Sequence, residues 1–183
     1  PSRNRLDELE IAIKSVFDQT MVPNELIVVD DGSSQPLDEN IFKGAPKKIQ
    51  CILLTNKTSK GGNFARNIAI KKATSEYIAF LDDDDFLLEN KIETQLKYMK
   101  TYGYLFSSTN MYTITHNSIS DEKLDFSIKE LYFNNEGDFV CSFSKYNIMK
   151  SNDICNSTVM IHRSIIEKTG DFKPEPYEDL EYW

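Results

Sequence analysis

Long apolar runs, paired cysteines and an excess of basic side chains are all missing from this sequence. No stretch of about 18 consecutive apolar residues occurs, so no membrane-spanning helix is predicted. The three cysteines, Cys51, Cys141 and Cys155, are widely spaced and lack a Cys-x-x-Cys pair, which argues against a disulfide framework or a zinc site. Lys and Arg total 21 against 29 Asp and Glu, a net charge of −8, so nucleic acid is not an expected partner.

What is present points to one folded unit. A chain of 183 residues, 40% hydrophobic and 27% charged, has the size and composition of a single globular domain over residues 1–183. It begins at Pro1 rather than at methionine, and Trp183 ends it inside an aromatic segment. We therefore expect a domain that is truncated at both ends.

Hydrophobic spacing in the first half alternates between helical and strand patterns. Apolar residues at helical spacing predict helices over 6–20, 61–73 and 88–102, with a weaker one over 37–43. Short β-branched apolar runs predict strands over 25–29, 49–54 and 77–81. This order indicates an α/β fold with a mostly parallel sheet flanked by helices, in which ligands bind beyond the carboxyl ends of the strands.

The second half is less regular. Strands are predicted over 103–109, 111–115 and 154–162, and a short helix from 164 to 170, whereas 117–135 is polar and irregular and 139–149 is ambiguous. We expect residues 111–183 to complete the domain and to hold a second substrate, and residues 1–110 to form the first ligand site.

Four consecutive aspartates, Asp82 to Asp85, follow the third predicted strand. A solvated loop that caps the next helix is the ordinary interpretation. Four adjacent carboxylates repel one another, however, and a divalent cation among them would relieve that repulsion. Spacing alone leaves both interpretations open, although an EF-hand is not expected because its glycine and distant glutamate are absent.

Two further polar clusters could contact a ligand. Asp30 and Asp31 end the first predicted strand in a turn sequence, and a carboxylate there could accept hydrogen bonds from a base or a ribose. Arg66 follows the glycine pair 61–62 at a predicted helix start, where backbone donors can face phosphate. Neither a P-loop nor a Gly-x-Gly-x-x-Gly motif is present.

The last acidic pair, Glu178 and Asp179, is either an ordinary acidic helix start or a general base beside the ligand crevice. His116 and His162 lack partner motifs, and we interpret both as structural.

Taken in order, these motifs resemble the family 2 glycosyltransferases, which have the GT-A (Rossmann-like) fold. The matching segments are PSRNR (1–5), QT (19–20) with Pro23, ELIVVDDGSS (25–34), GGNFARN (61–67), YIAFLDDDD (77–85) and EDLEYW (178–183). The resemblance spans nearly the whole chain, and six motifs in the correct order make it specific.

The resemblance implies an inverting transfer from a nucleoside-diphosphate sugar, most simply a UDP-sugar, and it assigns roles to individual residues. It implies nucleotide contacts from Pro1, Ser2, Arg3, Arg5, Asp30, Asp31, Arg66, Asp82 and Asp83; Mg2+ or Mn2+ ligands in Asp82 and Asp84; and a catalytic base in Asp179, with Glu178 as its competitor. Many relatives have Thr-Tyr where this chain has Ser2-Arg3, so an arginine plane would replace aromatic stacking on the base.

The family fold also has a central strand directly before the position of Pro1, and that strand is absent from this sequence. The implied acceptor is a hydroxyl of a glycan or lipid-linked sugar in bacterial surface polysaccharide synthesis. The implied location is the cytoplasm, at the inner face of the membrane, with peripheral membrane contact through regions outside this chain. Two rival functions stay open: a nucleotidyltransferase, which would release pyrophosphate, and a non-catalytic, metal-dependent carbohydrate-binding module.

Overall fold

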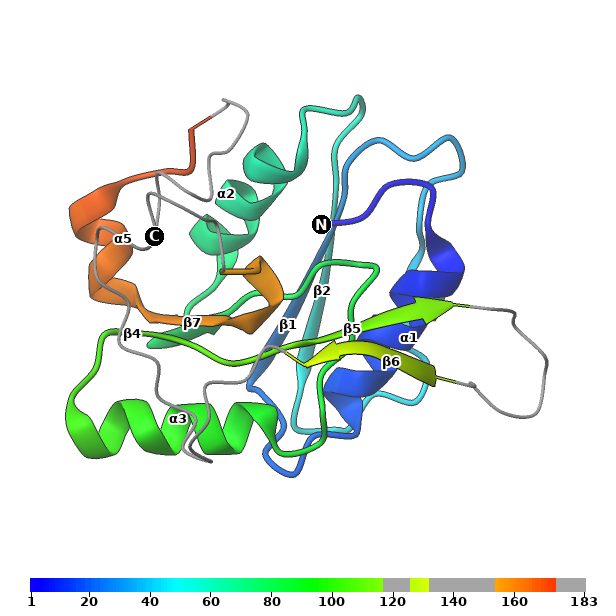
Figure 1. Ribbon diagram of the computed structural model, residues 1–183. Helices are drawn as coiled ribbons and strands as arrows, with labels where there is room; N and C mark the ends of the chain where they lie inside the picture. The colour runs from blue at the N-terminus through cyan, green and yellow to red at the C-terminus, as the bar shows by residue number, and fades with distance from the viewer. Residues whose placement is uncertain (117–125, 132–153, 174–183) are drawn as a thin grey trace.

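A computed structural model describes residues 1–116, 126–131 and 154–173 (Figure 1). The helices are α1 (Leu6–Phe17), α2 (Gly62–Lys72), α3 (Lys91–Tyr102) and α5 (Arg163–Thr169), with 3-10 turns η1 (Glu39–Phe42) and η2 (Asn156–Thr158). The strands are β1 (Glu25–Asp30), β2 (Gln50–Thr55), β3 (Tyr77–Ala79), β4 (Phe106–Ser108), β5 (Tyr112–His116), β6 (Phe126–Leu131) and β7 (Val159–His162).

β1 and β2 form a parallel pair, as the alternating pattern predicted. Their register runs from Glu25 opposite Gln50 to Asp30 opposite Thr55. The apolar run of β1 becomes fully buried toward its carboxyl end, where Val28 and Val29 lie in the core. α2, which follows β2 in the sequence, packs against β1 (Figure 1).

β3 does not join that pair. It lies antiparallel to β7, which also pairs antiparallel with β4, and β5 and β6 form a separate antiparallel pair. The single parallel sheet expected from three strands is therefore confirmed for β1 and β2 alone. The sequence shows an apolar run at β3, but not which partner it pairs with, because β7 is about eighty residues further along the chain.

One expectation for the second half was wrong, and another is confirmed only in part. Residues 126–131 form β6, although their polar composition suggested irregular structure, because pairing with β5 supplies the backbone partners. The strand expected over 154–162 begins only at Val159, because residues 156–158 form the turn η2. The ambiguous segment 139–149 lies outside the described residues.

A cavity of about 420 Å3 separates β1 from β3. Its wall is mainly apolar and includes side chains of α1, β1, α2, β3, α3 and the segment between β3 and α3; members of this set are Ile13, Leu26, Val28, Ala69, Tyr77, Leu87 and Leu96. On the edge of β1 opposite β2, Ser2 forms a backbone bridge. Its amide donates to the carbonyl of Val29 and its carbonyl accepts from the amide of Asp31, both at 2.8 Å. The cavity thus lies where a central strand was expected beside β1.

Two clusters of buried side chains hold the loop after β3 in place. Phe80, just before the aspartates, packs with Val159, Ile161 and Phe172. Leu87, just after them, packs with residues of α1, α3 and β7 in a second cluster. The aspartates are therefore tethered at both ends by the core. Within the described ranges, no helix combines the length and the apolar character needed to cross a bilayer.

Candidate active site

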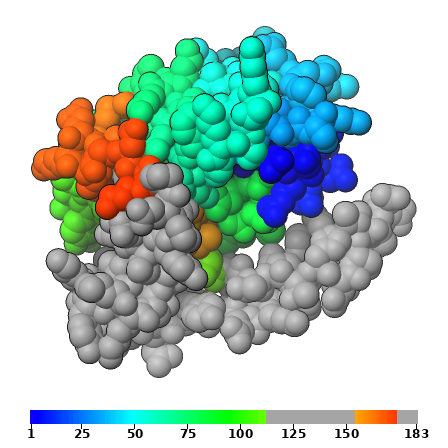
Figure 2. Space-filling model, turned by 90° about the horizontal axis from the view of Figure 1, so that it is seen from above, coloured from blue at the N-terminus to red at the C-terminus, as the bar shows by residue number. Residues whose placement is uncertain are grey.

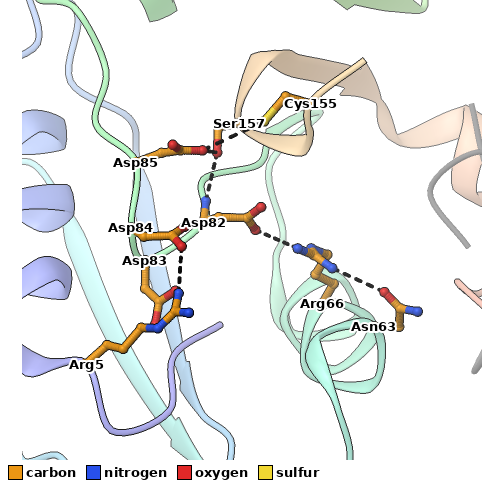
Figure 3. Close-up of polar contacts among 9 residues, drawn as sticks. All are labelled: Arg5, Asn63, Arg66, Asp82, Asp83, Asp84, Asp85, Cys155 and Ser157. Atoms are coloured by element: carbon orange, nitrogen blue, oxygen red, sulfur yellow. Dashed lines mark hydrogen bonds and ion pairs between the residues drawn. The ribbon is translucent and has the colours of Figure 1, made fainter. Parts of the chain in front are cut away.

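The aspartates after β3 form a tight turn. The amide of Asp85 donates to the carbonyl of Asp82 at 3.3 Å, which places Asp83 and Asp84 at the tip. The exposed fractions of the side chains are 24% for Asp82, 11% for Asp83 and 53% for Asp84. We call residues 82–85 the aspartate turn; its carboxylates point in different directions (Figure 3).

Two arginines form ion pairs with the aspartate turn, one on each side of it. Nη1 of Arg5 lies 2.6 Å from Oδ2 of Asp84 and 3.3 Å from Oδ1 of Asp83. The charges of Asp83 and then Asp84 raise the pKa of Arg5. On the other side, Nη2 of Arg66 lies 2.5 Å from Oδ1 of Asp82 (Figure 3). The repulsion expected among adjacent carboxylates is therefore partly offset by cations from distant parts of the chain.

Arg66 is held by polar side chains on two sides. Its side chain is 11% exposed, and Nη1 donates to Oδ1 of Asn63 at 3.1 Å, so the guanidinium is held between Asn63 and Asp82. Among the residues that the structure describes, its Nε has no hydrogen-bond partner although it is buried. Its position near the start of α2, in the second turn after Gly61, follows the sequence prediction.

Asp85 points away from the two arginines. Its Oδ2 accepts a hydrogen bond from Oγ of Ser157 at 2.6 Å and from Sγ of Cys155 at 3.7 Å. Oγ of Ser157 in turn accepts from the amide of Asp82 at 3.0 Å. Burial, together with the charges of Asp82 and Asp84, raises the pKa of Asp85, although the Ser157 bond opposes that shift. Sequence reasoning missed Ser157, which sat unmarked inside an expected strand.

Asp30 is fully buried at the end of β1 and serves the backbone. Its Oδ1 accepts from the amide of Ser33 and its Oδ2 from the amide of Leu37, both at 3.0 Å. These bonds fold the turn that follows β1. The carboxylate thus has an internal role besides the nucleotide contact expected from the resemblance.

Asp31 is also buried, and it holds the loop that leads into α2. Its oxygens accept from the amides of Lys60 and Gly61 at 2.8–3.0 Å, from Nδ2 of Asn56 at 2.7 Å and from Oγ of Ser59 at 2.7 Å. Burial alone would raise the pKa of Asp31, but these hydrogen bonds lower it below its ordinary value. Asp31 therefore sets the start of α2.

Gly32 lets the two loops touch. Its φ is +76°, in the left-handed region, and a Cβ added there would lie 2.6 Å from the amide nitrogen of Ser59. Both conditions favour glycine, because other residues are strained in this conformation and no side chain fits the gap. The loop after β1 and the loop before α2 are thus locked together, which fixes Arg66 relative to the carboxyl end of β1.

The N-terminal segment positions Arg5. Asn4 adopts φ +56° and its side chain accepts from the amide of Ser34 at 2.8 Å, while its own amide donates to Oγ of Ser33 at 3.0 Å. Arg5 then reaches across to the aspartate turn. In the surface view the blue N-terminal residues lie against the green segment on one face (Figure 2).

The structure thus brings together most of the predicted site residues. Ser2 is buried beside Asp30 and Asp31, Pro1 lines the cavity with Arg66, Asp82 and Asp83, and Arg3 is exposed. Glu178 and Asp179 lie outside the described residues. His162, interpreted as structural, contacts Ser164 and Glu76.

The aspartate turn fits a divalent cation that is shared with a ligand. In the described part of the chain, no three Asp, Glu, His or Cys groups are arranged to hold a metal by themselves. Mg2+ commonly uses one or two carboxylates and completes its shell with water and substrate phosphate. Asp82 and Asp84 supply hard oxygen donors of this kind, and Asp84 is open to solvent.

Comparison with known proteins adds a family. The profile described as "Glycosyl transferase family 2" matches residues 1–170. An uncharacterized glycosyltransferase of Rickettsia bellii is 41% identical over 111 residues, 60% of this chain and 16% of its own length. The UDP-Glc:alpha-D-GlcNAc-diphosphoundecaprenol beta-1,3-glucosyltransferase WfgD of Escherichia coli is 39% identical over 119 residues, 65% of this chain and 46% of its own length.

A solved structure shares the fold. S. aureus TarS 1-349 in complex with UDP matches 100% of this chain and 52% of its own chain, with a TM-score of 0.70 and 18% identity. The GT-A class predicted from sequence is therefore confirmed as the fold. This chain spans less than half the length of the two curated relatives above.

Proposed function

The chain belongs to glycosyl transferase family 2, and on this premise we propose that it forms the donor-binding part of an inverting glycosyltransferase. The donor is a nucleoside-diphosphate sugar, most simply a UDP-sugar, and the acceptor is a hydroxyl of a glycan or a lipid-linked sugar. Residues 1–110 make the donor half, and residues 111–183 the acceptor side.

One observation carries this proposal: Arg5 and Arg66, from separate segments, converge on the aspartate turn. Arg5 lies 2.6 Å from Asp84 and Arg66 lies 2.5 Å from Asp82. Cations and carboxylates placed alternately can bind a diphosphate directly and through a bridging metal. A plain helix cap would need neither arginine.

We assign the nucleotide to the surface between the N-terminal segment and the aspartate turn. Pro1, Ser2 and Arg3 line the base side, and Arg5 and Arg66 face the diphosphate. Because the oxygens of Asp30 and Asp31 already accept internal hydrogen bonds, these residues act on the base and ribose with their remaining lone pairs and by shaping the pocket. Asp82 and Asp83 complete the ribose side.

Asp82 and Asp84 would hold Mg2+ or Mn2+. When bound, the ion supplies charge neutralisation for the leaving nucleoside diphosphate. Before the ligand arrives, Arg5 balances the charge of Asp84. Both partners are about half exposed, so their pairing is weak enough to exchange.

The acceptor hydroxyl needs a base, because a sugar hydroxyl is a poor nucleophile at neutral pH. We assign this role to Asp179, with Glu178 as its competitor, since the carboxylates of the aspartate turn are committed to the donor. Attack from the face opposite the leaving group inverts the anomeric centre.

The name of WfgD describes a transfer from UDP-Glc to a diphosphoundecaprenol-linked sugar. We propose a lipid-linked or glycan acceptor of the same chemical class here, in bacterial surface polysaccharide synthesis at the cytoplasmic face of the membrane. Contact with the membrane would come from regions outside this chain.

Two variants of the native protein test the assignment of the base. Asp179→Asn should keep UDP affinity and lower turnover by about 10²–10⁴-fold, the effect of removing a general base. Glu178→Gln is the matched control and should stay active. If Glu178→Gln is inactive and Asp179→Asn is not, the base is the neighbouring residue; if both stay active, the pair is only an acidic helix start. Release of pyrophosphate instead of UDP would contradict glycosyl transfer altogether.

A further inference from the structure

Ser157 is a polar group that the donor site, as assigned above, does not use. It is 8% exposed and belongs to η2, which directly precedes β7. Its hydroxyl donates to Oδ2 of Asp85 at 2.6 Å and accepts from the amide of Asp82 at 3.0 Å. One hydroxyl therefore joins the first and last residues of the aspartate turn (Figure 3).

The residues on either side of Ser157 in η2 are buried, and Thr158 is hydrogen-bonded to its neighbours. The carbonyl of Thr158 accepts from Nε2 of Gln95 at 2.9 Å, and its hydroxyl lies 2.8 Å from Oγ of Ser108. The neighbours Asn156 and Thr158 are buried as well. A hydroxyl held in this way can fix the orientation of the carboxylates in the aspartate turn more firmly than solvent can.

Ser157 binds the one carboxylate of the aspartate turn that contacts neither Arg5 nor Arg66. Asp85 is turned toward Ser157 and Cys155, while Asp82, Asp83 and Asp84 contact Arg66 or Arg5 (Figure 3). Without the hydroxyl, the amide of Asp82 would lose its acceptor and Asp85 its shortest hydrogen bond. The four carboxylates could then rearrange, because adjacent like charges repel.

We propose that Ser157, acting through Asp85, is a positioning residue that orients the aspartate turn for the metal-bridged diphosphate. This inference rests on the proposed function. It assigns to Ser157, from the half of the chain proposed to hold the acceptor, a role in orienting the carboxylates that bind the donor. The pair thereby links η2, which leads into β7, to the loop after β3.

Titration of UDP, with Mn2+ and separately with EDTA, tests this on Ser157→Ala and Ser157→Thr. In Mn2+, Ser157→Ala should bind UDP about tenfold more weakly, the effect of one lost hydrogen bond to a charged group, with unchanged affinity in EDTA. Ser157→Thr keeps the hydroxyl and should restore most of the Mn2+ effect. Asp85→Ala deletes the bond to Ser157 but leaves the amide of Asp82 bonded to that hydroxyl. It should therefore reproduce most of the Ser157→Ala loss, and the double variant should be no worse than Ser157→Ala.

Ser108→Ala is the matched control, since it removes a hydroxyl from the same sheet that contacts Thr158 and not the aspartate turn. It should leave UDP binding unchanged in both conditions. If the wild type binds equally in Mn2+ and EDTA, the proposed function fails. If wild-type UDP affinity depends on Mn2+ and Ser157→Ala gains as much affinity from Mn2+ as the wild type, the positioning role is wrong. The same holds if Ser157→Ala only lowers the melting temperature.

Discussion

Asp30 and Asp31 lie at the carboxyl end of β1 with side chains almost completely buried, whereas Asp84, in the turn after β3, has a side chain that is 53% exposed. The first pair accepts hydrogen bonds mainly from backbone amides, at Ser33, Leu37, Lys60 and Gly61. The aspartate turn is contacted by Arg5 and Arg66 instead. Both are runs of aspartate after a buried strand, yet one builds loops and the other presents charge.

The comparison shows that the surroundings of a carboxylate determine whether it fixes the backbone or is available to a ligand. A buried carboxylate surrounded by amide donors stays ionised and fixes backbone that would otherwise be free. An exposed carboxylate paired with an arginine keeps lone pairs available for a ligand. We expect variants of the first pair to change stability and variants of the second cluster to change binding.

The largest effect is expected for Asp30→Ala. Two buried amides, of Ser33 and Leu37, would lose a charged acceptor, which should lower the free energy of unfolding by about 3 kcal/mol or more. Asp38→Ala is the control, because Asp38 accepts from Asn40 at an exposed site; it should cost about 1 kcal/mol or less. Urea denaturation measures both. Equal effects would mean that burial does not separate these carboxylates.

The second cluster should respond in binding. Arg66→Ala should weaken UDP binding by about 1.5–3 kcal/mol, the effect of losing a charge-assisted hydrogen bond, measured by titration calorimetry. Arg163→Ala is the matched control, since Arg163 donates to the carbonyls of Ala73 and Ser75 and should affect melting but not UDP. A large fall in melting temperature for Arg66→Ala with unchanged affinity would make Arg66 a structural ion pair.

Gly32→Ala, compared with Gly44→Ala, separates the steric clash between the two loops from the backbone strain of a left-handed residue. Its Cβ would lie 2.6 Å from the amide nitrogen of Ser59, and a left-handed alanine alone costs roughly 1–2 kcal/mol. Gly44→Ala has φ +88° but nothing within 4 Å of the added Cβ, so it carries the strain alone. Gly32→Ala should therefore destabilise more than Gly44→Ala. Equal losses would show that the close approach of the loops does not matter.

The smallest effect concerns pH. Glu25 resembles Asp31, because burial raises its pKa while hydrogen bonds oppose that shift. The bonds from Ser75 and Thr74 prevail and lower the pKa of Glu25 to about 2. A folded pKa below the ordinary value means that this contribution is present above about pH 4.5 and is lost as pH falls toward 2. Glu25→Gln should melt with a shallower pH dependence between pH 5 and 3. An unchanged slope would contradict the assignment.

The sequence was sufficient for features that depend on neighbouring residues. The apolar run of β1 predicted a buried strand, and the aspartates after β3 and the position of Arg66 on α2 were found from motifs. Pairing between distant segments was not readable: Ser157 meets Asp85 across 72 residues and Asp31 meets Lys60 across 29. Neither serine nor a loop lysine carries a local signal for such a contact, so the internal role of Asp31 emerged only from the fold.

The central claim is that the aspartate turn binds a nucleoside diphosphate through a divalent cation. UDP titration with Mn2+ and with EDTA, on the wild type, Asp84→Ala and Asp83→Ala, tests it directly. We predict tighter binding in Mn2+ for the wild type, a nearly complete loss of that gain in Asp84→Ala, and a smaller loss in Asp83→Ala. Equal wild-type affinity in Mn2+ and in EDTA would contradict the claim.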